Sequence, residues 1–369
     1  MTAAHDARPS KGLAIEESLV NKAEQPASAG LQALSAAGGF EPLAEQLPDQ
    51  QPAPLFSVVI PHWNAIQFLP TCFDALQRQT YQPIEVIVAD NASHDGSQEL
   101  IKREYPWVKL IELEKNYGFT GACNAGIRAA RGEFIALLNN DTEADPGWAA
   151  AVVDAFQRHP DAGSVASKML LFDRRDHIHT AGDFFTVDGR AGNRGVWERD
   201  EGQYDREEYV FSACGGSSAY RRTMLDAIGL LDDDFFFSGE DVDLGWRAQL
   251  AGWRCLYTPR AIVYHHLSAS GGGVTASFYD GRNSIFILVK DYPSALWRKY
   301  GGKILRAQWK LAWEAIRAWR GAAARARLRG MAAGLFSIPR MLRKRRIVQA
   351  SRRVPIEAIE AILSPAKEK

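Results

Sequence analysis

Short apolar runs recur along the first half of the chain, and each of them ends at polar residues. Runs of this length are typical of strands that are buried on both faces of a parallel sheet. The predicted strands occupy residues 56–60, 84–89, 108–113 and 134–138. Apolar residues at helical spacing predict helices over residues 66–79, 121–131 and 148–158. This alternation predicts an α/β fold with a mainly parallel, Rossmann-like sheet flanked by helices.

The pattern changes after residue 158. Residues 184–197 are rich in glycine and mix polar with apolar side chains, which predicts a hairpin or loop over a cleft. The following segments are predicted to form a strand at 210–213, a turn of small residues at 214–218 and a helix at 222–228.

The predicted strands end in polar residues or are followed by them. The first ends in Pro61, His62, Trp63 and Asn64, the second in Asp90, and the fourth in Asn139, Asn140 and Asp141. Ligands of parallel sheets bind beyond the carboxyl ends of the strands, so these side chains are expected at a cleft. Their oxygens suit Mg²⁺ or Mn²⁺, with a substrate phosphate completing the coordination. Alternatively, Asp141 or Thr142 caps a helix that begins near Pro146.

A second acidic group, Glu240, Asp241 and Asp243, directly follows three phenylalanines. The predicted start of a helix favours negative charge, so simple complementation of the helix dipole is one explanation. Apolar neighbours raise the basicity of a carboxylate, so a catalytic role is the other.

The motifs and the cysteine spacing argue against several classes of protein. The glycines in residues 117–126 do not form GxGxxG, and no GxxxxGK[ST] occurs, which argues against dinucleotide oxidoreductases and P-loop enzymes. The four cysteines are far apart, which argues against a disulfide framework or a zinc site and favours a reducing cytoplasm. Without an export segment or an apolar run of about 18 residues, the chain is expected neither to be secreted nor to span a membrane.

The net charge of zero hides a strong asymmetry. Residues 294–353 carry 17 lysines and arginines against one acid, Glu314, with tryptophans at helix-like intervals. This pattern predicts basic amphipathic helices on an anionic membrane surface, with nucleic acid binding as the competing use. The expected division is a disordered extension at 1–54, a catalytic domain at 55–292 and a basic helical tail at 293–369.

Six segments resemble, in order and spacing, the motifs of the family 2 nucleotide-sugar glycosyltransferases of the GT-A fold, particularly the rhamnosyltransferase-like branch. They are SVVIPHWN (57–64), VADNASHDGS (88–97), NYGFTGACNAGI (116–127), LLNNDTE (137–143), FFFSGEDVDLGWR (235–247) and PRAIVYHHLSAS (259–270). No single segment is specific, but together they cover roughly residues 55–290.

The resemblance implies a site for a nucleotide-sugar donor. Pro61, Trp63 and Asp90 match positions that line the nucleotide base, and the Asp90 carboxylate would accept a hydrogen bond from a pyrimidine N–H. The other donor-binding positions are Asn64, Asp95, Asn116, Asn140 and Arg282, the last as a basic residue that closes over the diphosphate. His179 and Asp183 are expected in the walls of the sugar and acceptor pocket.

The resemblance also implies a metal site. Asp141 matches the last aspartate of the DxD motif, the ligand of Mg²⁺ or Mn²⁺. Asn139 departs from the first aspartate, so weak metal binding is expected before the donor binds. His265 resembles the third metal ligand, and His266 is the alternative.

Asp241 resembles the catalytic base of an inverting transfer, in which one carboxylate takes the proton of the acceptor hydroxyl. Its neighbour Glu240 is the other candidate for this role.

The sequence therefore predicts an inverting, metal-dependent glycosyltransferase, peripheral on the cytoplasmic face of the membrane. It would move a sugar, by resemblance rhamnose from dTDP-rhamnose, onto a lipid-linked or polysaccharide acceptor in cell-surface glycan biosynthesis, without a nucleic acid partner. One alternative is a glycoside hydrolase that uses Asp141 with Glu240 or Asp241. The other is a membrane-associated scaffold with an inactive transferase fold.

Overall fold

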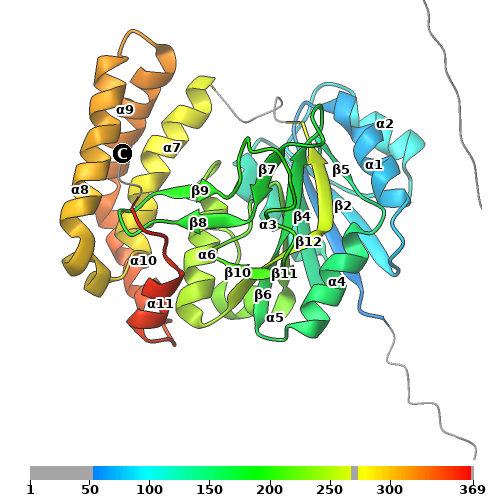
Figure 1. Cartoon of the computed structure of the whole chain (residues 1–369). Coiled ribbons are helices and arrows are strands. Elements are labelled where there is room, and N and C mark those ends of the chain that lie inside the picture. Colours follow the sequence, from blue (N-terminus) through cyan, green and yellow to red (C-terminus); the bar gives the residue numbers. More distant parts are fainter. Residues whose placement is uncertain (1–52, 267–272, 367–369) are drawn as a thin grey trace, which may run out of the picture. The chain divides into compact units, whose positions relative to one another are not determined.

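The computed structural model describes residues 53–266 and 273–366 (Figure 1). The extension expected at 1–54 therefore lies almost wholly outside the described residues. Among the helices in these two ranges, none is both long and apolar enough to cross a membrane.

One half of the main sheet is parallel and contains the four predicted strands. Its neighbours follow the order β3, β2, β1, β4, and every pair is parallel. The strands are β1 (Phe56–His62), β2 (Ile84–Asp90), β3 (Lys109–Glu112) and β4 (Phe134–Leu138). All of β1 and β4 is buried, as their continuous apolar sequences require.

The other half of the sheet is mixed, and the sequence pattern did not predict it correctly. It consists of β11 (Ser217–Arg221), antiparallel to both β4 and β6 (Ala162–Leu171), then β12 (Arg254–His265), parallel to β6, and β10 (Glu208–Val210) at the edge. The turn predicted at 214–218 is wrong at its end, because Ser217 already belongs to β11. The strand predicted at 210–213 contributes only Val210 to β10. Small side chains in β11 are buried between two strands without forming an apolar run.

Helices cover both faces of the sheet, as predicted. Alternate residues of β1 show this: Val58 and Ile60 pack with α1 and α4, whereas Val59 packs with α3 and α5. The helices are η1 (Ile66–Phe68), α1 (Leu69–Gln77), α2 (Ser97–Glu104), α3 (Gly118–Ala129), α4 (Trp148–Arg158), α5 (Arg222–Ile228) and α6 (Glu240–Ala251).

Four short strands complete this part of the fold. β5 (Thr142–Ala144) pairs with β12, and β7 (Ile178–Ala181) pairs with β6. The predicted hairpin forms between β8 (Asp183–Phe185) and β9 (Ala191–Asn193).

The C-terminal part is a layer of helices beside the end of the sheet, coloured yellow to red in Figure 1. They are α7 (Gly273–Lys290), α8 (Ser294–Arg317), α9 (Ala322–Phe336), α10 (Ile338–Ala350) and α11 (Ile356–Ile362). Helices α7 and α9 approach closely because Gly281 faces the α9 backbone and Gly330 faces the α7 backbone. A Cβ atom at either glycine would overlap with that backbone.

These helices share one apolar cluster with the predicted catalytic domain, residues 55–292, which we call the catalytic body. Trp246 and Tyr292 pack there with residues from beyond the expected boundary at 292/293, among them Ile304, Met341 and Val348. The packing is therefore continuous across that boundary.

Candidate functional site

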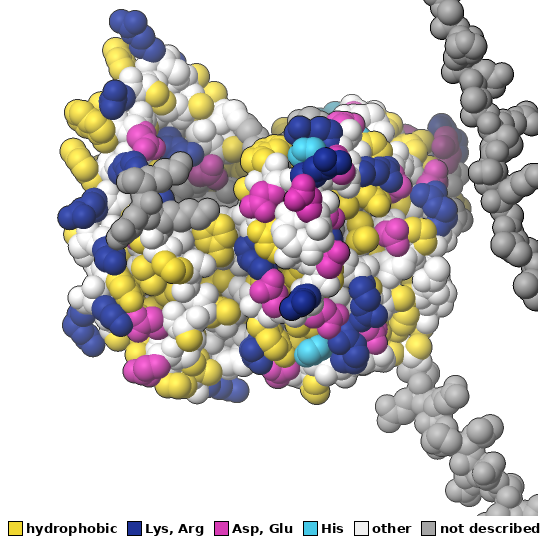
Figure 2. All heavy atoms as spheres, in the orientation of Figure 1, with side chains coloured by type: hydrophobic (Ala, Val, Ile, Leu, Met, Phe, Trp, Pro, Cys, Tyr) yellow, Lys and Arg dark blue, Asp and Glu magenta, His cyan; other side chains and the backbone are white. Residues whose placement is uncertain are grey.

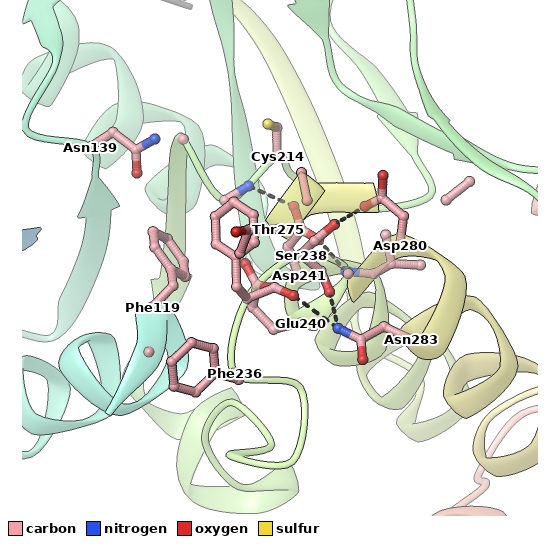
Figure 3. A pocket seen from close by; sticks show the side chains of 18 of the residues that line it. Phe119, Asn139, Cys214, Phe236, Ser238, Glu240, Asp241, Thr275, Asp280 and Asn283 are labelled. Atoms are coloured by element: carbon pink, nitrogen blue, oxygen red, sulfur yellow. Dashed lines mark hydrogen bonds between the residues drawn. The ribbon is translucent and has the colours of Figure 1, made fainter. Parts of the chain in front are cut away.

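A cavity of about 1190 Å³ opens at the carboxyl ends of β1 and β4. Its walls also include the loop before β11, the end of β12, the start of α6 and parts of α7, α8 and α9. Figure 3 shows Asn139 on one side and the acids of α6 with Asp280 and Asn283 of α7 on the other.

The wall formed by the end of β1 matches the predicted base-binding region. Trp63 is 55% exposed although it is large and apolar, so its ring is available for stacking. The other predicted donor-binding residues in the lining are Pro61, Asn64, Asn116 and Asn140.

Asp90, at the end of β2, is completely buried. Its Oδ2 accepts hydrogen bonds from the Ser93 amide at 3.0 Å and from Gln98 Nε2 at 2.6 Å. Its Oδ1 has no hydrogen-bond partner within the described ranges. A buried carboxylate oxygen without a partner is costly, which is consistent with accepting an N–H from a ligand, although Asp90 itself is not in the lining of the cavity.

The structure does not bring Asp95 into the lining of the cavity. Its carboxylate accepts from the Ile66 amide at 2.9 Å and from the amide and hydroxyl of Ser97. These hydrogen bonds outweigh the effect of burial and lower the pKa of Asp95. The residue therefore holds the loop before α2, because Asx-type hydrogen bonds use up its oxygens.

His62 is a site residue that the sequence reasoning did not assign. Its Nε2 lies 2.7 Å from Ser97 Oγ and its Nδ1 lies 2.7 Å from Asn140 Nδ2. Burial lowers its pKa despite the carboxylates of Asp90 and Asp95, so the imidazole is neutral. Its position at the end of β1 could have indicated this role. There it contacts Ser97 of the second motif and Asn140 of the fourth.

Asp141 and His265, the two residues predicted to bind the metal, lie next to each other. Asp141 Oδ1 lies 3.1 Å from His265 Nε2, and both residues are buried. Antiparallel pairing of β5 with β12 fixes this distance, since His265 stands opposite Thr142. Asn139 Oδ1 is buried nearby and lacks a partner in the described structure. A carboxylate, an imidazole and an unused amide oxygen suit Mn²⁺ and related cations, so the residues fit the expected metal.

The alternative of a helix cap is wrong for Asp141. Helix α4 begins after Gly147, whose amide donates to Asp145 Oδ1 at 2.9 Å. Thr142 donates its hydroxyl to the Asn139 carbonyl instead of capping that helix.

The structure also separates the two adjacent histidines. The ring of His266 stacks on Phe172 with centroids 3.5 Å apart, whereas His265 faces Asp141. His179 Nδ1 lies 3.1 Å from His265 Nδ1, and burial, followed by the charge of His265, lowers the pKa of His179 to about 3. A neutral His179 leaves His265 free to coordinate through Nε2.

Glu240 and Asp241 begin α6 and both line the cavity. Asp241 accepts two backbone hydrogen bonds, from Gly215 and Val242, each at 2.8 Å. Glu240 Oε2 is buried without a partner among the described residues. Burial, and then the charge of Asp241, raises the pKa of Glu240 to about 8, and burial also raises the pKa of Asp241. The third acid, Asp243, is bound by Arg247 and Lys290 and has a structural role.

The loop that presents these acids has an unusual backbone. Phe236 and Ser238 have φ of 63° and 67°, and Gly239 follows with 83°. Left-handed conformations of residues other than glycine persist only where the surroundings enforce them. Here Asn283 Nδ2 donates to the carbonyls of Phe237 at 2.9 Å and Ser238 at 2.6 Å.

Arg282 does not take the predicted place over the diphosphate. Its side chain is not in the lining, and its guanidinium donates to the carbonyls of Asp234 and Phe235, each at 2.7 Å. Its position on α7 points it at the loop before α6, where it assists Asn283.

The loop Cys214–Gly216 connects the two functional groups. The Asn139 amide donates to the Gly216 carbonyl at 3.0 Å, and the Gly215 amide donates to Asp241 Oδ2 at 2.8 Å. Figure 3 shows the second of these bonds beside Cys214. One short loop thus ties the metal-binding motif to the acidic pair.

Asp183, at the start of β8, lines the cavity on the same side as Asp241. Ligand atoms of Asp183, Cys214 and Asp241 lie within 4.8 Å of one another. Burial and then the charge of Asp241 raise the pKa of Asp183 well above its ordinary value. This shift favours the protonated form of Asp183 beside Asp241.

The chain is similar in sequence to known proteins of bacterial surface-glycan synthesis. An N-acetylglucosaminyl-diphospho-decaprenol L-rhamnosyltransferase of Mycobacterium tuberculosis (strain ATCC 25618 / H37Rv) is 30% identical over 249 residues, which cover 61% of this chain and 80% of that protein. An O-antigen biosynthesis protein of Myxococcus xanthus is 29% identical over 228 residues, which are 59% of this chain and 18% of that protein.

A solved structure of GalNAc-T7 with UDP, GalNAc and Mn²⁺ shares the fold. Its TM-score is 0.54 at 17% identity, with 64% of this chain and 48% of that chain covered. The sequence profile of glycosyl transferase family 2 matches residues 57–229, which include four of the six motifs. The chain belongs to glycosyl transferase family 2.

Proposed function

We propose that this glycosyltransferase is metal-dependent and inverting, and that it moves rhamnose from dTDP-rhamnose onto a lipid-linked saccharide. The Mycobacterium relative, named as a rhamnosyltransferase acting on a diphospho-decaprenol acceptor, supports this choice of sugar and acceptor. A glycoside hydrolase does not agree with family membership.

The loop Cys214–Gly216 is the observation that carries the proposal. It is hydrogen-bonded to Asn139 on one side and to Asp241 on the other. A donor held at Asn139 and Asp141 would therefore lie next to the base that serves its acceptor.

The proposed reaction is a single displacement. Asp241 takes the proton of the acceptor hydroxyl, whose oxygen bonds to the anomeric carbon as the bond to the nucleoside diphosphate breaks. Two backbone amides hold the Asp241 carboxylate in one orientation in the wall of the cavity. Burial raises the pKa of Asp183, which favours the protonated form that can donate a hydrogen bond to a sugar hydroxyl.

Asp141, His265 and Asn139 would hold the cation. When bound, a divalent cation neutralises charge on the diphosphate. Trp63 and Asp90 Oδ1 would bind the base by stacking and by accepting its imide N–H.

Thermal-shift measurements test this proposal. A ligand that binds only the folded state raises the melting temperature, so dTDP and dTDP-rhamnose should stabilise the enzyme more with Mn²⁺ than without it. Asp141→Ala and His265→Ala should remove the Mn²⁺-dependent part, whereas His266→Ala should retain it. If no pyrimidine nucleotide stabilised the enzyme, the donor assignment would be wrong. Transfer of radiolabelled sugar to a lipid-linked acceptor then separates an active enzyme from an inactive scaffold.

A further inference from the structure

Helix α8 has an apolar stripe on its outer surface. Leu305, Trp309, Trp313 and Ile316 are spaced three and four residues apart, which places them on one face of the helix. Leu305 and Trp309 are 65% and 64% exposed, and the rings of Trp309 and Trp313 stack with centroids 6.3 Å apart. Trp319 continues the exposed aromatic surface just beyond the helix. Contiguous exposed apolar surface of this kind marks an interaction site.

Unpaired cations accompany this stripe. The helical repeat places Arg306, Lys310 and Arg317 along one edge of it. None of these three, nor Lys303 or Arg320, forms an ion pair within residues 53–266 and 273–366. Figure 2 shows dark blue and yellow side chains next to one another along the left edge, where Figure 1 places α8.

The basic residues of α10 are used differently. Lys344 pairs with Asp232 at 2.5 Å, and Arg340 pairs with Asp234. Arg345 donates to the carbonyls of Val289 and Tyr292. These contacts attach α10 to the catalytic body, so the basic tail consists of an internal part and an outward-facing part.

The inner face of α8 belongs to the cavity. Gln308 and Leu311 line it together with Met331 of α9. Both amide atoms of Gln308 are buried and without a hydrogen-bond partner in the described chain. Helix α8 therefore has one face on the cavity and the other face on the outside.

We infer that the outer face of α8, formed by Leu305, Trp309, Trp313 and Ile316 with Arg306, Lys310 and Arg317, docks the enzyme on an anionic membrane surface. Tryptophan and leucine beside a row of cations are suited to the boundary between headgroups and acyl chains. The inference deepens the proposed function, because a lipid-linked acceptor is held in a membrane. Docking through its outer face places α8, the helix that also forms a wall of the cavity, on that membrane.

Vesicle sedimentation tests the inference with the full chain. The enzyme should sediment with vesicles that contain phosphatidylglycerol. It should remain in the supernatant when the vesicles consist only of phosphatidylcholine. The triple variant Arg306→Gln, Lys310→Gln, Arg317→Gln should lower the partition coefficient roughly 100-fold at low salt, since each cation contributes about a factor of five. The double variant Trp309→Ala, Trp313→Ala should remove the binding that survives at 1 M salt, where charge is screened.

Matched controls exist elsewhere on the surface. Arg128→Gln, Arg174→Gln, Arg206→Gln removes three exposed cations that, within the described structure, also lack acidic partners. Trp197→Ala removes a tryptophan that is 59% exposed, outside α8. Both controls should bind vesicles like the unchanged enzyme. Equal loss in control and α8 variants would overturn the inference, as would equal binding to neutral vesicles.

Other occupants of this face would give different results. If the α8 variants abolished a dimer seen by light scattering while vesicle binding was absent, the face would be a contact between copies of the chain. If the protein bound RNA and not vesicles, the face would be a nucleic acid site. Either outcome contradicts the inference. Nucleotide-induced thermal shifts do not involve vesicles, so a failed donor assignment and a failed membrane contact can be told apart.

Discussion

Glu240 and Asp241 are neighbours in sequence with different surroundings. Backbone amides bind both oxygens of Asp241, whereas one oxygen of Glu240 is buried without a described partner. Burial raises the pKa of both carboxyl groups, to about 8 for Glu240. The two amides that donate to Asp241 favour its charged form, which makes Asp241 the stronger candidate for the base.

Asp241→Asn should reduce the rate of transfer by about 10³-fold and leave the affinity for dTDP-rhamnose near that of the unchanged enzyme. The amide keeps the shape but cannot accept a proton, and general-base contributions are typically about 10²–10⁴-fold. Initial rates and calorimetric donor binding measure the two effects. If Glu240→Gln were inactive and Asp241→Asn active, the base would be Glu240.

Glu240→Gln should become more stable relative to the unchanged enzyme as the pH rises from 5 to 8. The unfolded chain releases the Glu240 proton near its ordinary pKa of 4.5, whereas the folded chain keeps it until about pH 8. The folded state thus binds more protons in this window, so ionisation destabilises it as pH rises. Glutamine cannot ionise and escapes this loss. Urea unfolding at several pH values measures the difference, and a difference independent of pH would contradict the shifted pKa.

Residue types and spacing predicted which motifs meet, but they did not give the direction of each side chain. Asp141 and His265 lie together as predicted, because their positions at strand ends follow from the pattern. Asp95 and Arg282 lie in motif segments as well, yet both bind backbone groups. Those backbone partners arise only after the loops fold, and no periodicity reports them.

At the scale of elements, α7 supports the catalytic loop. Asn283 Nδ2 donates to three carbonyls of the loop, those of Phe235, Phe237 and Ser238. The loop itself contains left-handed residues that need such support. Helix α7 is therefore a positioning element for the acids at the start of α6.

Asn283→Ala should lower the free energy of unfolding by about 3 kcal/mol and the transfer rate at least tenfold. Buried carbonyls that lose their donor cost roughly 1–3 kcal/mol each, and the loop is released to other conformations. Gln349→Ala is the matched control, because its amide also donates to two carbonyls, those of Lys290 and Asp291, outside the catalytic loop. It should lose stability but keep its rate per folded molecule. A rate loss of equal size in the control would refute the positioning role.

Elements were predictable where burial and sequence pattern coincide. The parallel strands β1, β2 and β4 are continuous apolar runs and were predicted. Strand β11 is equally buried but begins with two serines and an alanine, so it does not form an apolar run. Such a strand is defined by its partners, and its own residues resemble a turn.

At the scale of the molecule, the C-terminal helices complete a core that the catalytic body shares. A chain that ends after Pro293 should melt at a markedly lower temperature and bind a hydrophobic dye. It would lose Leu296, Ile304, Met341, Val348 and Ile359 from the shared cluster. At roughly 2 kcal/mol for each buried side chain, the loss approaches the whole stability of an ordinary domain.

Circular dichroism and dye fluorescence measure this effect. A chain that ends at Ala366 is the control and should melt like the full chain, because the cluster stays complete. An unchanged melting temperature after the cut at Pro293 would show that the body folds without these helices.

Composition predicted the excess of positive charge near the C-terminus, but not how it is divided. Ion pairs of Lys344 and Arg340 with Asp232 and Asp234 join residues more than 100 positions apart. Counting charges along the chain cannot detect such pairs. Only the fold distinguishes the cations of α10, which face the body, from those of α8.

The double attachment of the loop Cys214–Gly216 has a thermodynamic consequence. If donor binding at Asn139 changes the affinity for the acceptor through Gly216 and Gly215, the acceptor must change the affinity for the donor by the same factor. The affinity for each substrate, measured with and without the other, would then give one coupling free energy, which is transmitted by the three residues Cys214–Gly216.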